Sequence, residues 1–507
     1  MKRIGDRFRQ SVTGYDFVFW LLVATCSSFI AMSYPMMRLR YDLWEHVDKI
    51  REMVLDDSVT SHAKRYWYAC WAFIFKLFAV TDIFTIATVI HRVQFIANCV
   101  LIYFAAKQLF EPLLSLDRHN KHQNQWLSSL ALSSVLVWLV TIGTFSFIQQ
   151  AWIMWYSVNY QITLSFLLLS ISLTVNLLTV EQSKTTQIAK ALTAAALLIL
   201  ILLFHAGELA YFIFYLPIFI ICFGGILKNK LSAKNLIVIG LCGGVALYLG
   251  LNFYKDQTPL LITLLKNNEI SKIMELINQK GTWNAVEGGN RYAGNWNELY
   301  AISVYSMLFI GSLSAFNVLK THKRVMAFIV LSLIFCFAPT YVFSSGFLSL
   351  VSYDGIVNRY YFASLLFLAV PLCVYFAITK FKFTNHPIIL IAITFLIITI
   401  AYSFSKFYNN RGVFYQNVKS ITTSLRAKKI EMEVTEVDVA NIGAQIKLTE
   451  LSANVDDFVY CGLFHKIYIV RYVFDKKNVL FYRLGNHTIT ECEAYAKGLG
   501  KNVVYIQ

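Results

Sequence analysis

The chain has 507 residues, of which 57% are apolar and only 15% are charged, and its formal net charge is +16. Soluble domains carry roughly 25% charged residues, so this composition excludes an ordinary soluble protein and indicates a polytopic membrane protein. The excess of Lys and Arg predicts no nucleic-acid partner, because basic residues collect in the cytoplasmic loops of membrane proteins.

Eleven apolar segments have the length and flanking charges of helices that cross a bilayer. The first follows a basic N-terminus and is too long for a signal-peptide core, so we expect it to be a spanning helix. The predicted spans are residues 15–34, 90–110, 125–146, 159–180, 188–205, 210–227, 235–254, 299–318, 325–345, 362–379 and 386–404. The sequence therefore predicts an all-α transmembrane domain over residues 1–404, with about 11 transmembrane helices.

The distribution of basic residues predicts how these helices cross the membrane. With a cytoplasmic N-terminus, the inner loops are basic, and they contain Arg118, Lys121, Lys184, Lys228, Lys230, Lys234, Lys320, Lys323, Arg324, Lys380 and Lys382. The short outer loops near 147–158 and 205–209 contain no Lys or Arg. The positive-inside rule then places the N-terminus in the cytoplasm and the C-terminus outside. The composition and the single outer tail are typical of a bacterial inner-membrane protein, with a periplasmic C-terminus.

Two large outer loops are predicted, over residues 35–89 and 255–298. Within the first, residues 66–80 are apolar but short, contain Lys76 and precede Asp82. Counting this stretch as a span would place every later basic loop outside. We therefore expect an interfacial or re-entrant helix on the outer surface, in contact with membrane lipids.

Residues 405–507 form a polar tail whose last half alternates apolar and polar residues, as strands do. We expect a small α/β domain on the outer face. The tail contains Cys461 and Cys492, whereas the other seven of the nine cysteines lie in or beside apolar stretches. An oxidising compartment would allow this pair to form a disulfide, but the sequence leaves the pairing open.

Three residues with catalytic chemistry follow the first span: Asp42, Glu45 and His46. On a helix, Asp42 shares one face with Glu45 at i+3 and with His46 at i+4. Neighbouring carboxylates raise one another's pKa, and a carboxylate near the membrane surface is suited to act as a general base for a hydroxyl or amine. The alternative interpretation is an amphipathic loop helix whose charges face water.

Basic residues in the outer loops are candidates for a phosphate site. Lys64 and Arg65 lie in the same loop as Asp42, and Arg359 with Tyr360 lies in the last outer loop before the tenth span. An Arg clamps phosphate with two hydrogen bonds, although an interfacial Arg in an aromatic belt explains the same pattern. No Cys/His cluster has metal-ligand spacing, so no metal or other cofactor is predicted, and a divalent metal is not indicated.

This layout resembles the GT-C superfamily of integral-membrane glycosyltransferases. The resemblance is carried by residues 40–46 (RYDLWEH) after the first span, residues 62–68 (HAKRYWY) before an apolar helix, and residues 358–361 (NRYY) before a late helix. The resemblance in topology, meaning the order of membrane spans and outer loops, extends over the whole chain. A DxD or WWDxG-like motif is absent from the sequence, which argues against the oligosaccharyltransferase branch and against a bound metal.

Family membership would imply transfer of a sugar from a polyprenyl-phosphate carrier to a glycan, lipid or protein acceptor outside the cytoplasm, as in the assembly of cell-envelope polysaccharide. By analogy, Asp42 would deprotonate or orient the acceptor, with Glu45 as the competing candidate. The residues that would bind the donor phosphate and sugar are His46, Lys64, Arg65, Arg359 and Tyr360.

Two further functions remain open. An O-antigen or capsule polymerase or ligase would use outer-loop arginines, Arg291 and Arg359, in place of the carboxylate. A lipid or sugar transporter or flippase would show inverted repeats, broken helices and charges near the membrane midplane. The sequence shows no paired halves, and its ionisable residues concentrate in outer loops, which favours chemistry at the membrane surface.

Overall fold

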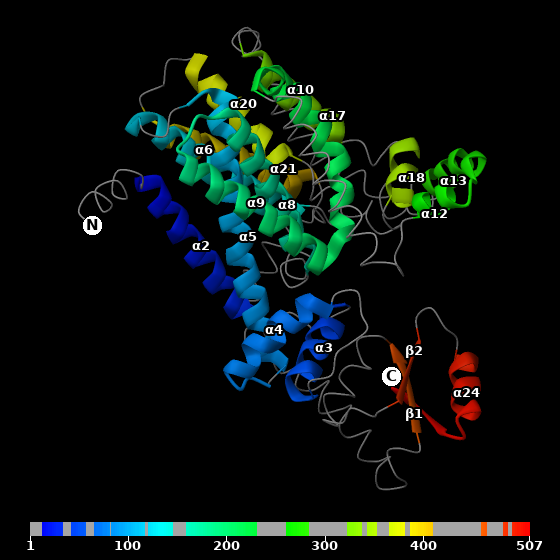
Figure 1. Ribbon diagram of the computed structural model, residues 1–507. Coiled ribbons are helices and arrows are strands. Elements are labelled where there is room, and N and C mark those ends of the chain that lie inside the picture. The colour runs from blue at the N-terminus through cyan, green and yellow to red at the C-terminus, as the bar shows by residue number, and fades with distance from the viewer. Residues whose placement is uncertain are drawn as a thin grey trace. The chain divides into compact units, whose positions relative to one another are not determined.

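The computed structural model describes residues 13–33, 42–56, 65–81, 83–116, 120–144, 159–230, 260–282, 322–336, 342–351, 365–380, 386–408, 458–463, 480–484 and 489–506. These residues are mostly helical, with a small sheet near the C-terminus (Figure 1). They divide into two compact units. One combines Met1–Cys26 with Phe95–Val418, and the other combines Ser27–Gln94 with Lys419–Gln507. The predicted division at residue 404 differs from this one, because it assigns the loop 35–89 to the transmembrane domain.

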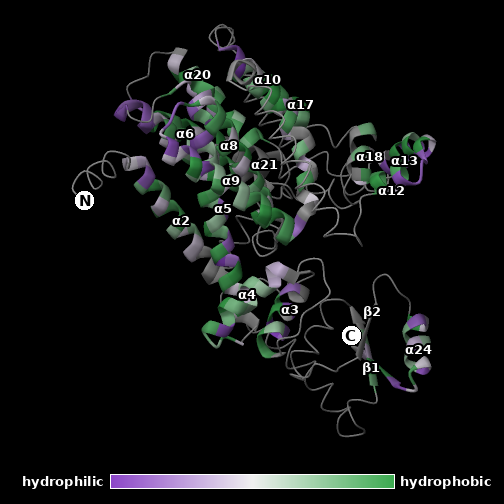
Figure 2. Cartoon of the chain, viewed as in Figure 1, coloured by the Kyte–Doolittle hydropathy of each residue, from purple (hydrophilic) through white to green (hydrophobic). Residues whose placement is uncertain are grey.

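Most of the apolar sequence forms helices. They are α2 (Gly14–Ser33), α5 (Ile83–Leu114), α6 (Lys121–Thr144), α8 (Asn159–Thr179), α9 (Lys184–His205), α10 (Phe212–Lys230), α17 (Lys323–Cys336), α18 (Val342–Val351), α20 (Leu366–Lys380) and α21 (Ile388–Tyr408). A 3₁₀ helix, η3 (Ala206–Tyr211), joins α9 to α10. Figure 2 shows hydrophobic residues along most of these helices.

Among the residues that the structure describes, three stretches are long and apolar enough to cross a membrane: Thr85–Leu114, Ile162–Thr179 and Lys184–His205. At about 1.5 Å per residue, a helix of roughly 20 residues spans the ~30 Å hydrocarbon core of a bilayer. Shorter apolar stretches lie in α10, α20 and α21. By length and composition, the chain is therefore a membrane protein.

Eight of the eleven predicted spans coincide with a single helix each, namely α2, α5, α6, α8, α9, α10, α20 and α21. The prediction of one helix over residues 325–345 is tested only in part, because α17 covers residues up to Cys336, α18 starts at Val342, and the residues between them lie outside the described part of the chain. The spans predicted at 235–254 and 299–318 lie outside the described residues, so the number of spans stays a prediction.

Polar and aromatic contacts define how the helices of the first unit run. Phe19 of α2 stacks on Tyr103 of α5 with ring centroids 4.0 Å apart, and Asp16 meets Lys107 further along α5, so the two helices are antiparallel. α5 and α8 run parallel. Ser165 donates a hydrogen bond to the Asn98 side chain (2.7 Å), and eleven residues later Asn176 donates one to the Gln108 carbonyl (2.9 Å). α8 and α9 form a helical hairpin, and the Ser170 hydroxyl donates to the Ala194 carbonyl across it.

A smaller helical group occupies part of the predicted loop 255–298. It consists of α12 (Leu260–Lys266) and α13 (Ile270–Thr282), which pack against α18. Leu264, Ile277 and Leu350 form the core of this group. At Gly346 the helices approach so closely that an added Cβ would lie 1.9 Å from the Ile277 carbonyl oxygen. Only glycine fits this crossing.

Two short helices of the second unit follow α2: α3 (Asp42–Asp56) and α4 (Arg65–Leu77). α3 buries Val47 and Ile50, which lie on one face, and α4 buries Trp67, Tyr68 and Phe75. At about 1.5 Å per residue, a helix of this length extends about 20 Å, which is too short to cross a bilayer. α4 corresponds to the short non-spanning helix predicted over residues 66–80.

The C-terminal residues form a small α/β arrangement, as predicted. Three parallel strands, β1 (Phe458–Leu463), β2 (Leu480–Leu484) and β3 (Asn502–Ile506), have the order β2-β1-β3. α24 (Ile489–Gly498) connects β2 to β3. One face of β1 packs on α24 through Val459 and Cys461, and Tyr460 on the other face is also buried. Burial of both faces is typical of parallel sheets.

Candidate functional site

The predicted carboxylates lie at the start of α3. Asp42 is the first residue of this helix, so Asp42, Glu45 and His46 all fall within its first five residues. The backbone therefore has the helical spacing on which the prediction of a shared face depends. The side chains of Asp42 and Glu45 lie outside the described part of the structure.

His46 anchors this end of α3 to α4. Its side chain is only 2% exposed, and its Nδ1 atom lies 2.7 Å from the Tyr68 hydroxyl. The imidazole ring also meets the Trp67 ring edge-on, with centroids 6.0 Å apart. A second tether joins Arg51 of α3 to the chain after α4, because its Nε donates to the Thr81 carbonyl (3.0 Å). The start of α3 is thus held in a defined position.

Burial gives His46 a packing role, and its predicted contact with the donor phosphate stays a prediction. Arg65 is the first residue of α4, but its side chain is outside the described part of the chain. Lys64, Arg359 and Tyr360 also lie outside the described residues. The structure therefore brings His46 to the aromatic face of α4 and leaves the meeting of Asp42 with the predicted basic residues as a prediction.

The far side of α4 carries exposed apolar side chains. Phe73 and Leu77 of α4 are more than half exposed, as is Phe78 directly after the helix, whereas Trp67 and Tyr68 are buried. A helix with one face packed on a neighbour and another apolar face exposed fits a location at the membrane surface. The location of α4 at the membrane surface stays a prediction.

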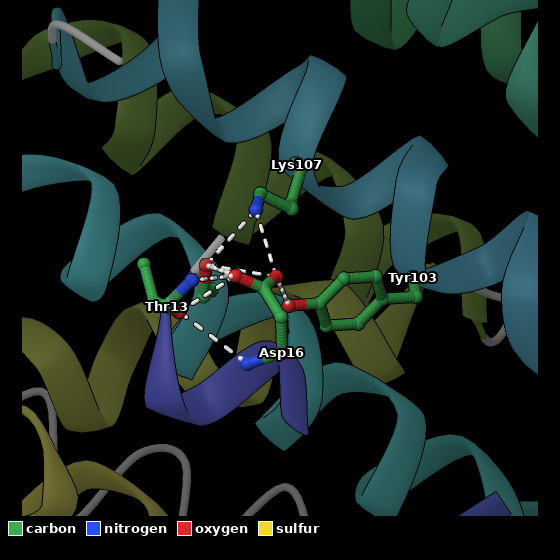
Figure 3. Close-up of polar contacts among 5 residues, drawn as sticks. Thr13, Asp16, Tyr103 and Lys107 are labelled. Atoms are coloured by element: carbon green, nitrogen blue, oxygen red, sulfur yellow. Dashed lines mark hydrogen bonds and ion pairs between the residues drawn. The ribbon is translucent and has the colours of Figure 1, made fainter. Parts of the chain in front are cut away.

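A buried polar cluster that the sequence reasoning did not identify lies at the start of α2. Thr13 and Asp16 form a reciprocal helix cap (Figure 3). The Thr13 backbone N–H and hydroxyl both donate to Asp16 Oδ2, at 2.6 and 2.7 Å, and the Asp16 N–H donates to the Thr13 hydroxyl at 3.3 Å. Such a capping box satisfies amide groups that the first turn of a helix leaves unpaired.

Groups from two other helices complete the coordination of this carboxylate. The Tyr103 hydroxyl and the Lys107 ammonium, both on α5, donate to Asp16 Oδ1, the latter at 3.0 Å (Figure 3). The Ser128 hydroxyl of α6 lies 3.2 Å from Oδ1 and itself accepts a hydrogen bond from Lys107 (2.9 Å). We call these five residues, Thr13, Asp16, Tyr103, Lys107 and Ser128, the Asp16 cluster.

The carboxylate at the centre of the Asp16 cluster is hydrogen-bonded on both sides by groups of the protein. Both carboxylate oxygens accept hydrogen bonds, and the Asp16 and Lys107 side chains are each 12% exposed. A buried charge is tolerated when it is paired and its remaining acceptors are satisfied. The arrangement therefore suits the joining of three helices better than chemistry on a substrate. A sequence signal existed, because Asp16 and Lys107 are opposite charges within predicted membrane spans.

A second buried network joins α5 to the α8–α9 hairpin. The Asn176 amide donates to Glu111 Oε2 at 2.7 Å, and its oxygen accepts from Lys190 Nζ at 2.6 Å and from Gln182 at 2.8 Å. Asn176 is fully buried. This network again pairs opposite charges, here through a bridging amide, and it ties the hairpin to α5.

Within the described residues, no group of three or more His, Cys, Asp or Glu side chains is arranged to hold a metal ion. Comparisons with protein-family models, with curated proteins and with solved structures find no match for this chain.

Proposed function

We propose that this protein is a membrane glycosyltransferase that moves a sugar from a polyprenyl-phosphate carrier to an acceptor on the extracytoplasmic side of the membrane. The observation that carries the proposal is the helix α3, which begins at Asp42 and is anchored on α4 by the buried His46–Tyr68 contact. Asp42 is the general base, and Glu45 is the competing candidate. The resemblance to the GT-C superfamily in the run 40–46 supports the same assignment.

The location of α3 and α4 supports chemistry on a lipid-linked substrate. The exposed apolar side chains of α4 fit insertion at headgroup level, where the phosphate of a polyprenyl carrier also lies. We expect a helix that is fixed to α4 to bring its first turn, which contains Asp42 and Glu45, near that level. Preorganised groups of this kind accelerate a reaction because they need no rearrangement when the substrate binds.

The proposed reaction is a displacement at the anomeric carbon of the donor. The acceptor oxygen forms a bond to this carbon as its proton passes to the Asp42 carboxylate, and the bond from the carbon to the carrier phosphate breaks. The electron pair of the broken bond leaves with the phosphate. Lys64, Arg65 and Arg359 are the proposed partners of that phosphate, because cationic side chains stabilise its developing charge.

The experiment that tests the proposal is Asp42→Asn. The matched control is Glu52→Gln, which removes the same charge further along α3. We expect Asp42→Asn to abolish glycosyl transfer from a polyprenyl-phosphate-linked sugar, measured on the purified protein, with normal abundance in the membrane. We expect Glu52→Gln to retain transfer, because it leaves the first turn of α3 intact.

Two results would change this assignment. Full transfer by Asp42→Asn together with loss of transfer by Glu45→Gln would move the general base to Glu45. Full transfer by both variants would remove the first-loop carboxylates from the mechanism, and Arg359→Lys would then test the arginine-based polymerase or ligase function.

A transporter or flippase is the alternative function that the sequence leaves open. The measurement that separates the two functions is movement of the intact lipid-linked sugar across a proteoliposome membrane. Movement of the donor without release of its sugar would establish transport and exclude transfer.

A further inference from the structure

Two cysteines of the C-terminal α/β arrangement face each other in its core. Cys461 lies on the central strand β1 and Cys492 lies on α24, and both are fully buried. Their Cα atoms are 6.5 Å apart, within the range that a disulfide bridges, and the structure pairs them. The pair joins the strand to the helix that covers it, across a sequence separation of 31 residues.

This pair differs from the other cysteines that the structure describes as free. Cys26, Cys99, Cys222 and Cys373 lie in apolar helices, where a cysteine behaves as a small hydrophobic residue. Cys70 is exposed on α4. Only Cys461 and Cys492 pair among the described residues. The pairing therefore follows from the packing of α24 on β1 and not from a general abundance of cysteine.

We propose that Cys461 and Cys492 are joined by a disulfide in the mature protein and that the C-terminal α/β arrangement therefore folds outside the cytoplasm. Disulfides persist in oxidising compartments and are rare where thiol reductants keep cysteines reduced. In the reaction, two thiols lose two protons and two electrons to an oxidised dithiol protein of that compartment. Its own disulfide becomes two thiols as the Cys461–Cys492 bond forms.

The disulfide also bears on the orientation of the chain. Lys419–Gln507 belongs to the same compact unit as Ser27–Gln94, which contains α3 and α4. A C-terminal region outside the cytoplasm agrees with the predicted orientation, in which α3 lies outside and α2 runs outward from a cytoplasmic N-terminus. This reasoning is independent of the distribution of Lys and Arg, and it does not depend on the proposed function.

The first experiment counts free thiols in the full-length protein made in a bacterial host. Cells are quenched in acid, the protein is denatured, and its thiols are labelled with a maleimide–polyethylene glycol reagent before or after chemical reduction. We expect two more labels after reduction than before it. Cys461→Ser and Cys492→Ser should each remove this gain completely. The matched control Cys70→Ser, which changes an exposed cysteine of the same unit, should keep it.

Because labelling is done on denatured protein, a variant that folds poorly still gives a count. A wild-type protein with equal numbers of labels before and after reduction would overturn the disulfide. A gain that persists in Cys461→Ser would also overturn it, because another pair would then account for the gain.

The second experiment reports the compartment. Alkaline phosphatase, whose own activity requires disulfides, is fused after Gln507, and a matched fusion carries green fluorescent protein, which fluoresces in the cytoplasm. We expect an active phosphatase and no fluorescence. The opposite pair of results would overturn the assignment to the outside. Neither experiment measures sugar transfer, so its outcome is separate from the test of Asp42.

Discussion

The first turns of α2 and α3 both contain an aspartate, Asp16 and Asp42, and the contacts that the structure describes around these two turns differ. Asp16 is enclosed by donors from its own helix cap, α5 and α6, so both of its oxygens are occupied. At the start of α3, the described anchor is His46, four residues after Asp42. The comparison teaches that the enclosed carboxylate of Asp16 joins helices. A carboxylate that is to act as a general base must stay accessible to substrate, so another residue, here His46, has to hold its helix in place.

The largest effect is expected at Asp16. Asp16→Ala leaves the Lys107 ammonium buried without its anionic partner, and the loss of one member of a buried pair destabilises a protein by about 3–5 kcal/mol. We expect a much lower unfolding temperature of the purified protein and reduced abundance in the membrane. The double variant Asp16→Leu with Lys107→Met should recover most of this loss, because it removes both charges.

An Asp16→Ala protein with normal stability and no sugar transfer would contradict the structural role of Asp16. Asp16 would then serve the reaction, and the cluster would need a role beyond joining helices.

The next effect concerns the second unit. Removing the Cys461–Cys492 cross-link restores the freedom of a loop with a sequence separation of 31 residues in the unfolded chain. For a loop of this length, the chain-entropy relation gives about 3–4 kcal/mol of lost stability. We expect the double Ser variant to be cleaved by protease in the C-terminal region at lower denaturant concentration than the wild type. Equal protease resistance would show that packing of α24 alone holds this region.

A smaller effect is expected at the anchor of α3. Tyr68→Phe removes the hydroxyl that meets His46 Nδ1 but keeps the aromatic ring in the core, and one such hydrogen bond contributes about 1 kcal/mol. We expect a small drop in the unfolding temperature together with a clear drop in kcat for sugar transfer. An unchanged kcat would show that the His46–Tyr68 contact stabilises the fold without positioning the reacting groups.

The smallest effect is expected at Tyr505 on β3. Its hydroxyl donates to Glu493 Oε1 of α24 at 2.5 Å, and this hydrogen bond raises the pKa of Tyr505 above its usual value. The contribution is present below the ordinary pKa of tyrosine and is lost as the pH rises through the raised value. Because the pair is exposed, we expect Tyr505→Phe to leave the unfolding temperature unchanged at neutral pH. A measurable loss would mean that this surface contact supports the sheet.

Much of the fold could be predicted from the sequence, because apolar length and flanking charge decide which segments become membrane helices. The bounds of α8, for example, match the prediction to within one residue, and the short α4 was separated from the spans. The span predicted over residues 325–345 is tested only in part, because the residues between α17 and α18 lie outside the described part of the chain. The candidate site is harder to predict, because its residues come from segments that are distant in sequence.

The sequence by itself determined that this is a helical membrane protein with a small α/β region at its C-terminus, because hydrophobic periodicity and length are local properties. The tertiary structure decided which polar groups meet. It paired Asp16 with Lys107, His46 with Tyr68, and Cys461 with Cys492. Each pair joins two elements, and buried polar groups must find partners that only the packing of those elements provides.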